Sequence, residues 1–268
     1  MPSLLYEKRD GIAYLTLNRP EVRNALDPET ICRLADAWQD YMSDDSLRVA
    51  IITGAGDKAF SSGADLGKLI PLFTGARQPQ DEWDRRLLAH RDLTCLALLR
   101  GVELYKPVIA AINGFCLAGG TELIQATDIR IAAAHATFGL MEVKRAIIPA
   151  GGSMVRLPRQ IPFCKAMEIL LVGDPISAQE AYRIGLVNYI VPAEQVMATT
   201  EAFARKIAEN GPIAVRKIKE TVLKALSVSV EEGFKLENES ARVVMQTDDA
   251  KEGPRAFIEK RKPHYIGR

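Results

Sequence analysis

The sequence predicts an α/β protein that has one sheet-based core followed by a helical C-terminal region. Apolar runs bounded by turn residues dominate the first 140 of the 268 residues, whereas helical periodicity dominates the last hundred. This order favours a single domain whose helical tail packs on its own core or on a partner subunit. The composition, 47% apolar and 26% charged, is ordinary for a globular protein that buries a large core.

Bulk charge and residue usage argue against several classes of function. The net charge of +1 provides no field to hold nucleic acid or a membrane. The cysteines form no CxxC pair and the three histidines are scattered, so metal-site spacing is absent. The N-terminal stretch lacks the apolar core of a signal peptide, and no apolar run is long enough to span a membrane. We therefore expect a cytoplasmic protein with reduced cysteines: Cys32, Cys95, Cys116 and Cys164.

The N-terminal elements follow from short-range signals. The runs 4–8 and 12–18, separated by Arg9-Asp10-Gly11, predict a hairpin. Asp27 as N-cap and Pro28 at the first helical position predict a helix that continues to about residue 42. The apolar run 48–54, which ends in glycine, predicts a buried strand.

The middle of the chain alternates between strands and helices. Two prolines and the lack of periodicity predict a mobile loop over 71–82, and a long helix is expected over 83–99. Strands are then predicted at 106–114, 128–134 and 136–139, with a short helix near 122–126. Helices are predicted from residue 165 onward, over 165–173, 177–185, 193–210, 212–226, 230–246 and 249–261.

Two glycine-containing loops each follow a buried strand: "AFSSGADL" (59–66) and "GFCLAGGTEL" (114–123). Backbone N–H groups in a loop or at a helix start have no intrahelical acceptor, and two of them aimed at one point form an oxyanion hole. Small residues would leave room for the incoming oxygen. Each loop taken alone is also typical of an ordinary packed turn, and neither matches a dinucleotide or P-loop pattern.

Two glutamates in weakly polar surroundings, Glu122 in "ELIQA" and Glu142 in "FGLMEV", are candidate acid–base groups. Desolvation raises the pKa of a carboxyl toward neutrality, where an acid or base works best. The alternative is a structural role, in which the glutamates pair with Arg130 or Lys144 or one of them is exposed at a helix start.

Together these motifs resemble the crotonase superfamily, also called the enoyl-CoA hydratase/isomerase superfamily, over essentially the whole chain. The matching segments are "NRPEVRNALD", "KAFSSGADL", the central run 106–143, "GDPISAQEAYRIGLVNYIVP" and "FIEKRKP". The resemblance implies a spiral of repeated ββα units over residues 1–195. It also implies a helical C-terminal region, 196–268, that builds a homotrimer or a dimer of trimers.

The resemblance also implies roles for individual residues. The backbone N–H groups of Ala64 and Gly119 would form the oxyanion hole, and Glu122 and Glu142 would be the catalytic acid–base pair. The substrate-binding positions would be Arg23, Ala25, Leu26, Ala150, Phe257 and Lys260, with the last two reaching the nucleotide of CoA from an adjacent subunit. The implied activity is hydration of a 2-enoyl-CoA thioester, with residues 71–82 bordering the acyl pocket. No metal or redox cofactor is implied, and CoA enters as part of the substrate.

Three departures from the family pattern concern substrate fit. Met141 stands where many hydratases have proline, Ala150 replaces a glycine, and Lys144-Arg145 closely follow the second glutamate. Other crotonase-type activities remain open, namely a Δ3-Δ2-enoyl-CoA isomerase or a dehydratase of a hydroxyacyl-CoA such as carnitinyl-CoA. A non-catalytic CoA- or RNA-binding scaffold is the alternative from another class.

Overall fold

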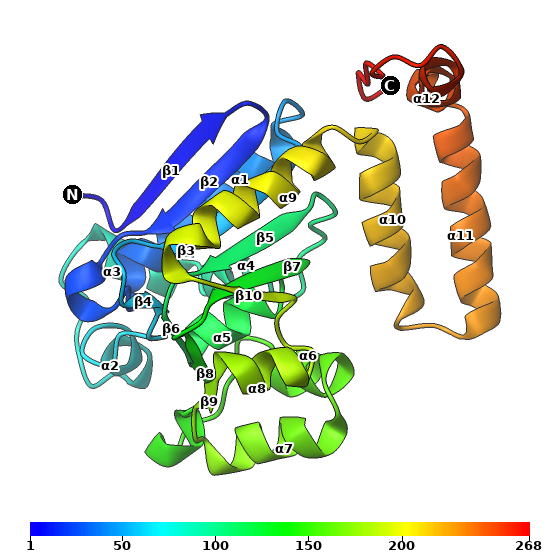
Figure 1. The fold of residues 1–268 in the computed structure, drawn as a ribbon. Coiled ribbons are helices and arrows are strands. Elements are labelled where there is room, and N and C mark those ends of the chain that lie inside the picture. The colour runs from blue at the N-terminus through cyan, green and yellow to red at the C-terminus, as the bar shows by residue number, and fades with distance from the viewer.

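A six-stranded sheet forms the centre of the computed structural model, which describes all 268 residues (Figure 1). Its strand order is β1-β2-β3-β5-β7-β10; β1 and β2 are antiparallel, and the other neighbours are parallel. The predicted N-terminal hairpin and the buried strands are confirmed. The bounds are β1 Leu4–Arg9, β2 Ile12–Leu17, β3 Val49–Gly54, β5 Val108–Ile112, β7 Ile129–Ala133 and β10 Tyr189–Val191.

A second, four-stranded sheet lies beside the first and carries the two glycine-containing loops. Its order is β4-β6-β8-β9, with β4, β6 and β8 parallel and β9 antiparallel to β8. The bounds are β4 Ala59–Ser61, β6 Phe115–Leu117, β8 Thr137–Gly139 and β9 Ile176–Ser177. Only β8 was predicted as a strand, because β4 and β6 are three-residue strands inside segments that read as loops.

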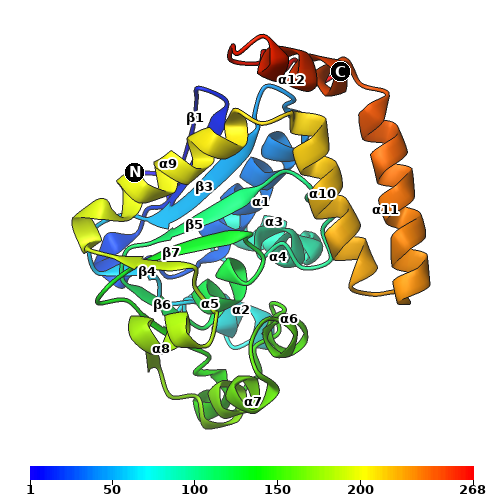
Figure 2. The same ribbon diagram turned by 45° about the vertical axis from the view of Figure 1, so that its right-hand side comes forward.

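Helices cover the large sheet on both sides (Figures 1 and 2). Helix α9 (Val196–Ala208) crosses one face, and α1 (Pro28–Ser43) lies behind the other. Asp27 caps α1 by accepting a hydrogen bond from the Thr30 N–H at 3.0 Å, as the sequence predicted. Every residue of β3 and β5 is buried, which explains why both strands read as continuous apolar runs.

Two predictions for residues 71–99 are wrong. The expected long helix is two helices, α3 (Glu82–Ala89) and α4 (Asp92–Ala97), because the backbone leaves the helical region at His90. The expected loop begins as helix α2 (Leu69–Thr74), which ends at Gly75 in a left-handed conformation. The Arg77 guanidinium then ties the remaining loop to the buried Asp84 carboxylate, at 2.5 and 2.8 Å.

The helix-rich C-terminal part is confirmed, with some elements that the sequence did not indicate. The predicted short helix is α5 (Gly119–Ile124), which begins three residues earlier than expected, while α6 (Ser153–Gln160) and β10 were not predicted. The remaining helices are α7 Phe163–Val172, α8 Ala178–Arg183, α10 Pro212–Ala225, α11 Val230–Met245 and α12 Asp248–Ile258. Short 3-10 turns lie at η1 Pro20–Val22, η2 Glu142–Arg145 and η3 Ala193–Gln195.

The last three helices stand apart from the rest of the molecule. Helices α10 and α11 form an antiparallel pair that extends alongside the body, and α12 lies across the end of that pair (Figures 1 and 2). Arg48 ties this region to the body by donating hydrogen bonds to the Ala208 and Tyr265 carbonyls. None of the helices is both long and apolar enough to cross a membrane.

Candidate active site

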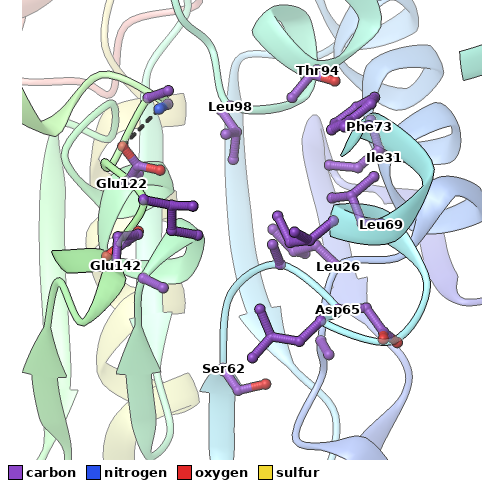
Figure 3. Close-up of a pocket in the computed structure, with 18 of the residues that line it drawn as sticks. Leu26, Ile31, Ser62, Asp65, Leu69, Phe73, Thr94, Leu98, Glu122 and Glu142 are labelled. Atoms are coloured by element: carbon purple, nitrogen blue, oxygen red, sulfur yellow. Dashed lines mark hydrogen bonds between the residues drawn. The ribbon is translucent and has the colours of Figure 1, made fainter. Parts of the chain in front are cut away.

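A cavity of about 730 Å³ collects most of the predicted site residues. The first turn of α5 and the turn η2 form one wall, while α2, α4 and the segment after β4 form the opposite wall (Figure 3). Most of its lining is hydrophobic. Of the predicted residues, Arg23, Ala25, Leu26, Ala64, Glu122, Glu142 and Ala150 line the cavity.

The amides of Ala64 and Gly119 lie near each other and are free. Neither N–H donates a hydrogen bond to another protein group. A Cβ atom built on Gly119 would lie 3.7 Å from the Ala64 nitrogen, which places the two loops in contact. The first loop is held by a short parallel bridge, in which Leu26 N–H donates to Gly63 O at 2.8 Å and Asp65 N–H donates to Leu26 O at 2.9 Å. Ala64 lines the cavity, and Gly119 is not itself a lining residue but directly follows Ala118, which is one, so both unused donors lie at this wall.

Ala118 holds the second loop in an unusual backbone conformation. Its φ of 49° and ψ of −123° are values that L-residues rarely adopt, and such strain costs about 1–3 kcal/mol. The Ala118 N–H donates to Gly139 O at 2.7 Å, which anchors the turn to β8. Because Ala118 directly precedes α5, this turn leaves the Gly119 N–H at the helix start without an intrahelical acceptor.

The glycines of the second loop serve packing more than access for an oxygen, which corrects the simpler expectation from the sequence. A Cβ atom on Gly114 would lie 2.2 Å from the Lys58 carbonyl oxygen, and one on Gly120 would lie 2.8 Å from the Ser61 carbonyl oxygen. Both glycines thus let β6 and α5 approach the strand β4. A Cβ atom on Gly119 would meet only ordinary contacts of 3.4 Å or more, so close packing does not demand glycine there.

Glu122 projects from α5 into the cavity wall and is almost fully buried, with 4% exposure. Its Oε1 accepts hydrogen bonds from Gly151 N–H at 2.7 Å and Ser153 N–H at 3.3 Å (Figure 3 shows the first). Burial raises the pKa of the Glu122 carboxyl above its ordinary value, while these amides oppose that shift. The two donors favour the ionised form and fix the direction of the carboxylate.

Glu142 is also buried, but fewer hydrogen bonds offset the cost of burying its carboxyl than at Glu122. It begins the turn η2, and its Oε2 atom has no hydrogen-bond partner. Burial raises the pKa of Glu142 to about 7, and the nearby charge of Glu122 adds to that rise against the opposing effect of Arg145. At neutral pH the carboxyl of Glu142 is therefore about half protonated, which suits a proton donor.

The ion pairs that could have explained these glutamates structurally are absent. The Arg130 guanidinium donates instead to the Leu186, Gln125 and Thr127 carbonyls and to the Gln160 side chain. The Lys144 ammonium pairs with Asp174. Both glutamates face the cavity without a cationic hydrogen-bond partner.

The loop before α6 contributes a residue that sequence reasoning missed. Ala150 lines the cavity and its N–H makes no protein hydrogen bond, but the neighbouring Gly151 N–H is the group that holds Glu122. A Cβ atom on Gly151 would lie 2.6 Å from Glu122 Oε2 and 2.5 Å from Leu98 Cδ1. The glycine pair in "PAGGSM" was the available signal, since a glycine in such a loop often marks a close approach to the backbone.

Sequence reasoning also missed much of the apolar wall. Leu69 from α2 and Leu98, just after α4, line the cavity together with Phe73, which lies within the segment expected to border an acyl pocket. Nothing in the spacing of the 83–99 run indicated that its C-terminal end faces Glu122. The fold brings this wall to the site by packing α4 on α1.

Phe257 and Lys260 do not join the cavity within one chain. Phe257 lies on α12 with 85% exposure, and Lys260 lies two residues after the end of that helix. Neither residue lines the cavity, and α12 lies across the end of the α10–α11 pair (Figures 1 and 2). Arg23 does line the cavity, where its guanidinium lies 5.4 Å from the centre of the Phe115 ring. No group of three His, Cys, Asp or Glu side chains is placed to hold a metal ion.

Comparison with known proteins agrees with this architecture. Residues 7–268 match the enoyl-CoA hydratase/isomerase family. The chain is 40% identical to enoyl-CoA hydratase EchA19 of Mycobacterium tuberculosis, over 100% of this chain and 97% of the relative. It is 38% identical to the (E)-benzylidenesuccinyl-CoA hydratase of Thauera aromatica, over 100% of both chains. The crystal structure of an enoyl-CoA hydratase from Bacillus anthracis superposes with a TM-score of 0.89 at 37% identity, covering 99% of this chain and 100% of that one.

Proposed function

The chain belongs to the enoyl-CoA hydratase/isomerase family, and from this premise we propose that it adds water across the double bond of a 2-enoyl-CoA thioester. One observation carries the proposal: two buried carboxyl groups with raised pKa values line the same cavity as Ala64, whose N–H has no protein acceptor, and the equally free N–H of Gly119 follows the lining residue Ala118. This set of groups matches what hydration needs, namely a base, an acid and an oxyanion site.

The free amides act on the thioester carbonyl. As water adds at the β-carbon, negative charge moves through the conjugated system to the carbonyl oxygen. The N–H groups of Ala64 and Gly119 stabilise that charge more than they stabilise the neutral substrate, which lowers the barrier. Most of the lining is hydrophobic, and the lower dielectric of such surroundings strengthens both hydrogen bonds.

The two glutamates divide the proton transfers between them. Glu122, whose carboxylate accepts two backbone N–H groups, is the base that orients the water and takes its proton. Glu142, whose pKa lies at about 7, donates a proton to the α-carbon of the enolate. The two backbone hydrogen bonds at Glu122 thus favour its ionised form, and the burial of Glu142 favours its protonated form, the division that two nearby acids require.

The predicted substrate contacts and assembly complete the proposal. Arg23, Ala25 and Leu26 line the end of the cavity that would receive the CoA part of the substrate, which needs no separate cofactor. Phe257 and Lys260 would contact CoA bound to a neighbouring subunit, in a homotrimer or a dimer of trimers. The core of 1–195 would then supply the chemistry and the region 196–268 would supply the assembly.

The test is hydration of crotonyl-CoA by purified Glu122→Gln and Glu142→Gln variants. Each substitution keeps the size of the side chain and removes its acid–base function, so each should lower kcat by about 10³-fold or more. Glu194→Gln, at an exposed position in η3, is the matched control and should leave the rate unchanged. Near wild-type hydration by either active-site variant would refute the assignment.

The pH dependence of the wild-type enzyme gives a second check. Glu142 must be protonated to act, so kcat/KM should fall as pH rises above about 7, approaching tenfold per pH unit. Glu122 must be ionised, so kcat/KM should also fall toward low pH.

Dehydration of a hydroxyacyl-CoA uses the same groups in reverse, and both glutamates face the cavity as that reaction requires. A relative named carnitinyl-CoA dehydratase, from Proteus mirabilis, is 37% identical over 99% of both chains. Comparing kcat/KM for enoyl-CoA and hydroxyacyl-CoA substrates of several chain lengths would assign the preferred direction and substrate.

A further inference from the structure

A short chain of buried polar side chains lies behind Glu122. The Gln125 Nε2 group donates to the Ser153 hydroxyl oxygen at 2.8 Å, and both residues are almost completely buried, at 2% and 0% exposure. Gln125 lies one turn after Glu122 along α5, and Ser153 is the first residue of α6. Buried polar groups away from a site are usually satisfied by backbone, whereas this pair leads directly to a carboxylate that faces the cavity.

Ser153 contacts Glu122 through its backbone. The Ser153 N–H donates to Glu122 Oε1 at 3.3 Å, and the neighbouring hydroxyl also acts to lower the pKa of Glu122. Because Gln125 donates to the hydroxyl oxygen, the hydroxyl hydrogen remains available for a second acceptor. The Glu122 carboxylate, which the Ser153 N–H already contacts, would be the preferred acceptor, because a hydrogen bond to an ionised group is stronger than one to a neutral group.

The position of Gln125 is itself fixed from the far side. The Gln160 side chain donates to the Gln125 backbone carbonyl at 2.8 Å, and the buried Arg130 guanidinium donates to Gln160 Oε1 at 3.0 Å. Arg130 also donates to the carbonyl of Gln125, the C-cap residue of α5, and to that of Thr127 in the turn that follows. These bonds brace the C-terminal end of the helix that carries Glu122 and fix the backbone from which the Gln125 side chain reaches Ser153.

We propose that Ser153 and Gln125 are positioning residues that keep Glu122 ionised and directed at the water it activates. The inference rests on the proposed function, in which Glu122 is the base. Ser153 supplies hydrogen bonds that favour the carboxylate, and Gln125 orients the Ser153 hydroxyl. Without them the buried Glu122 would take up a proton at higher pH, because burial would act with less opposition.

The first experiment measures kcat/KM for crotonyl-CoA against pH in wild type and Ser153→Ala. Loss of the hydroxyl should move the acidic limb of the profile upward by about one pH unit, as expected for one hydrogen bond to a buried charge. Activity should fall about tenfold at pH values below the limb and change little on the plateau above it. Ser153→Thr restores the hydroxyl and should restore the position of the limb.

A merely structural role would give a different result. If Ser153 only fills space, Ser153→Ala should lower kcat/KM by the same factor at every pH, and such a profile would overturn the proposal. An unmoved limb would overturn it too, because the Ser153 hydroxyl would then donate to Gln125 Oε1 in place of Glu122.

Gln125→Met provides an independent readout at a site away from the substrate. Gln125 Oε1 has no hydrogen-bond partner, so an apolar side chain of similar length leaves few polar groups unsatisfied. The acidic limb should move in the same direction as in Ser153→Ala, by a smaller amount. A limb that stays at the wild-type pH in Gln125→Met would contradict the role of Gln125.

The Glu122→Gln variant distinguishes a failure of the proposed function from a failure of the positioning role alone. If Glu122→Gln keeps near wild-type hydration, the proposed function itself fails. If Glu122→Gln abolishes hydration while Ser153→Ala and Gln125→Met leave the limb in place, only the positioning role is refuted.

Discussion

The body around the cavity and the three C-terminal helices differ in how much apolar surface they bury. In the body, large side chains such as Trp38, Tyr41 and Phe60 have no exposed surface. In the tail, α11 buries no residue at all, and the buried residues from 212 onward are Pro212, Thr247, Asp249 and Ala256.

Several of the exposed side chains of the tail are nonetheless apolar. Ile218, Leu226, Val230, Phe234 and Met245 expose 60–73% of their surface. Large exposed apolar patches mark interaction surfaces, because leaving them in water costs free energy. The comparison teaches that the body brings the cavity together within one chain, whereas the tail leaves apolar side chains exposed, which the proposed assembly would cover.

The largest effect should come from adding a side-chain atom at Gly63, where the two loops that carry the Ala64 and Gly119 amides touch. Gly63→Ala would place a Cβ atom 2.5 Å from Ala118 Cβ and 2.9 Å from the Gly119 nitrogen, at a φ of +89°. The loops must move apart, so the two N–H groups should no longer converge. We expect kcat for crotonyl-CoA to fall by about 10²–10³-fold, the usual cost of losing one oxyanion donor.

Gly185→Ala is the matched control for backbone strain. Gly185 also has a positive φ, of +80°, but a Cβ atom there would meet nothing within 4 Å. Both variants should unfold at a lower temperature than wild type, because alanine is disfavoured at positive φ. Only Gly63→Ala should lose turnover, and equal turnover in the two variants would contradict the role of the loop.

The next effect concerns stability, because the ionised form of the buried Glu142 lowers the free energy of unfolding. Its pKa rises from 4.5 to about 7 on folding, so the folded state binds the proton more tightly. That contribution to stability is fully present below pH 4.5 and is lost as pH rises through about 7. Glu142→Gln should therefore be more stable than wild type at pH 8 by on the order of 2–3 kcal/mol.

Urea unfolding at a series of pH values checks this expectation. The difference in unfolding free energy between Glu142→Gln and wild type should be largest above pH 7 and should shrink steadily toward pH 4.5. Glu239→Gln, at an exposed position on α11, serves as the control from the tail and should show no such trend. A difference that does not vary with pH would show that Glu142 is not held protonated by burial.

The smallest effect should come from the tail. Phe234→Glu introduces a charge on the exposed apolar surface of α11 without touching the core of the body. We expect light scattering after size-exclusion chromatography to show a lower mass than wild type. We also expect KM for crotonyl-CoA to rise by about tenfold, because Phe257 and Lys260 could no longer reach a neighbouring subunit.

The adjacent exposed Lys235 offers the control. Lys235→Glu adds the same side chain one residue away, at a position that is already charged, and should leave both mass and KM unchanged. A Phe234→Glu variant with wild-type mass and KM would refute the proposal that assembly through the tail contributes to substrate binding.

Much of this protein was readable from local signals. The Asp27–Pro28 helix start, the buried strands β3 and β5, and the C-terminal helices follow from capping residues and periodicity, which act over a few positions. The boundaries failed where local signals were weak. Strands β4 and β6 are too short for a period to show, and the break at His90 has no proline or glycine to announce it.

The candidate site shows the same division. The sequence by itself determined the types of groups present: two carboxyls in apolar surroundings and two loops with small residues. Only the tertiary structure decided that Gly151 and Ser153 bind Glu122, that Glu142 Oε2 has no partner, and that Arg130 and Lys144 bind elsewhere. The reason is physical. The sequence gives the type of each side chain directly. The pKa of that side chain, its partners and its access to a cavity depend on neighbours that are distant in the chain and that packing brings together.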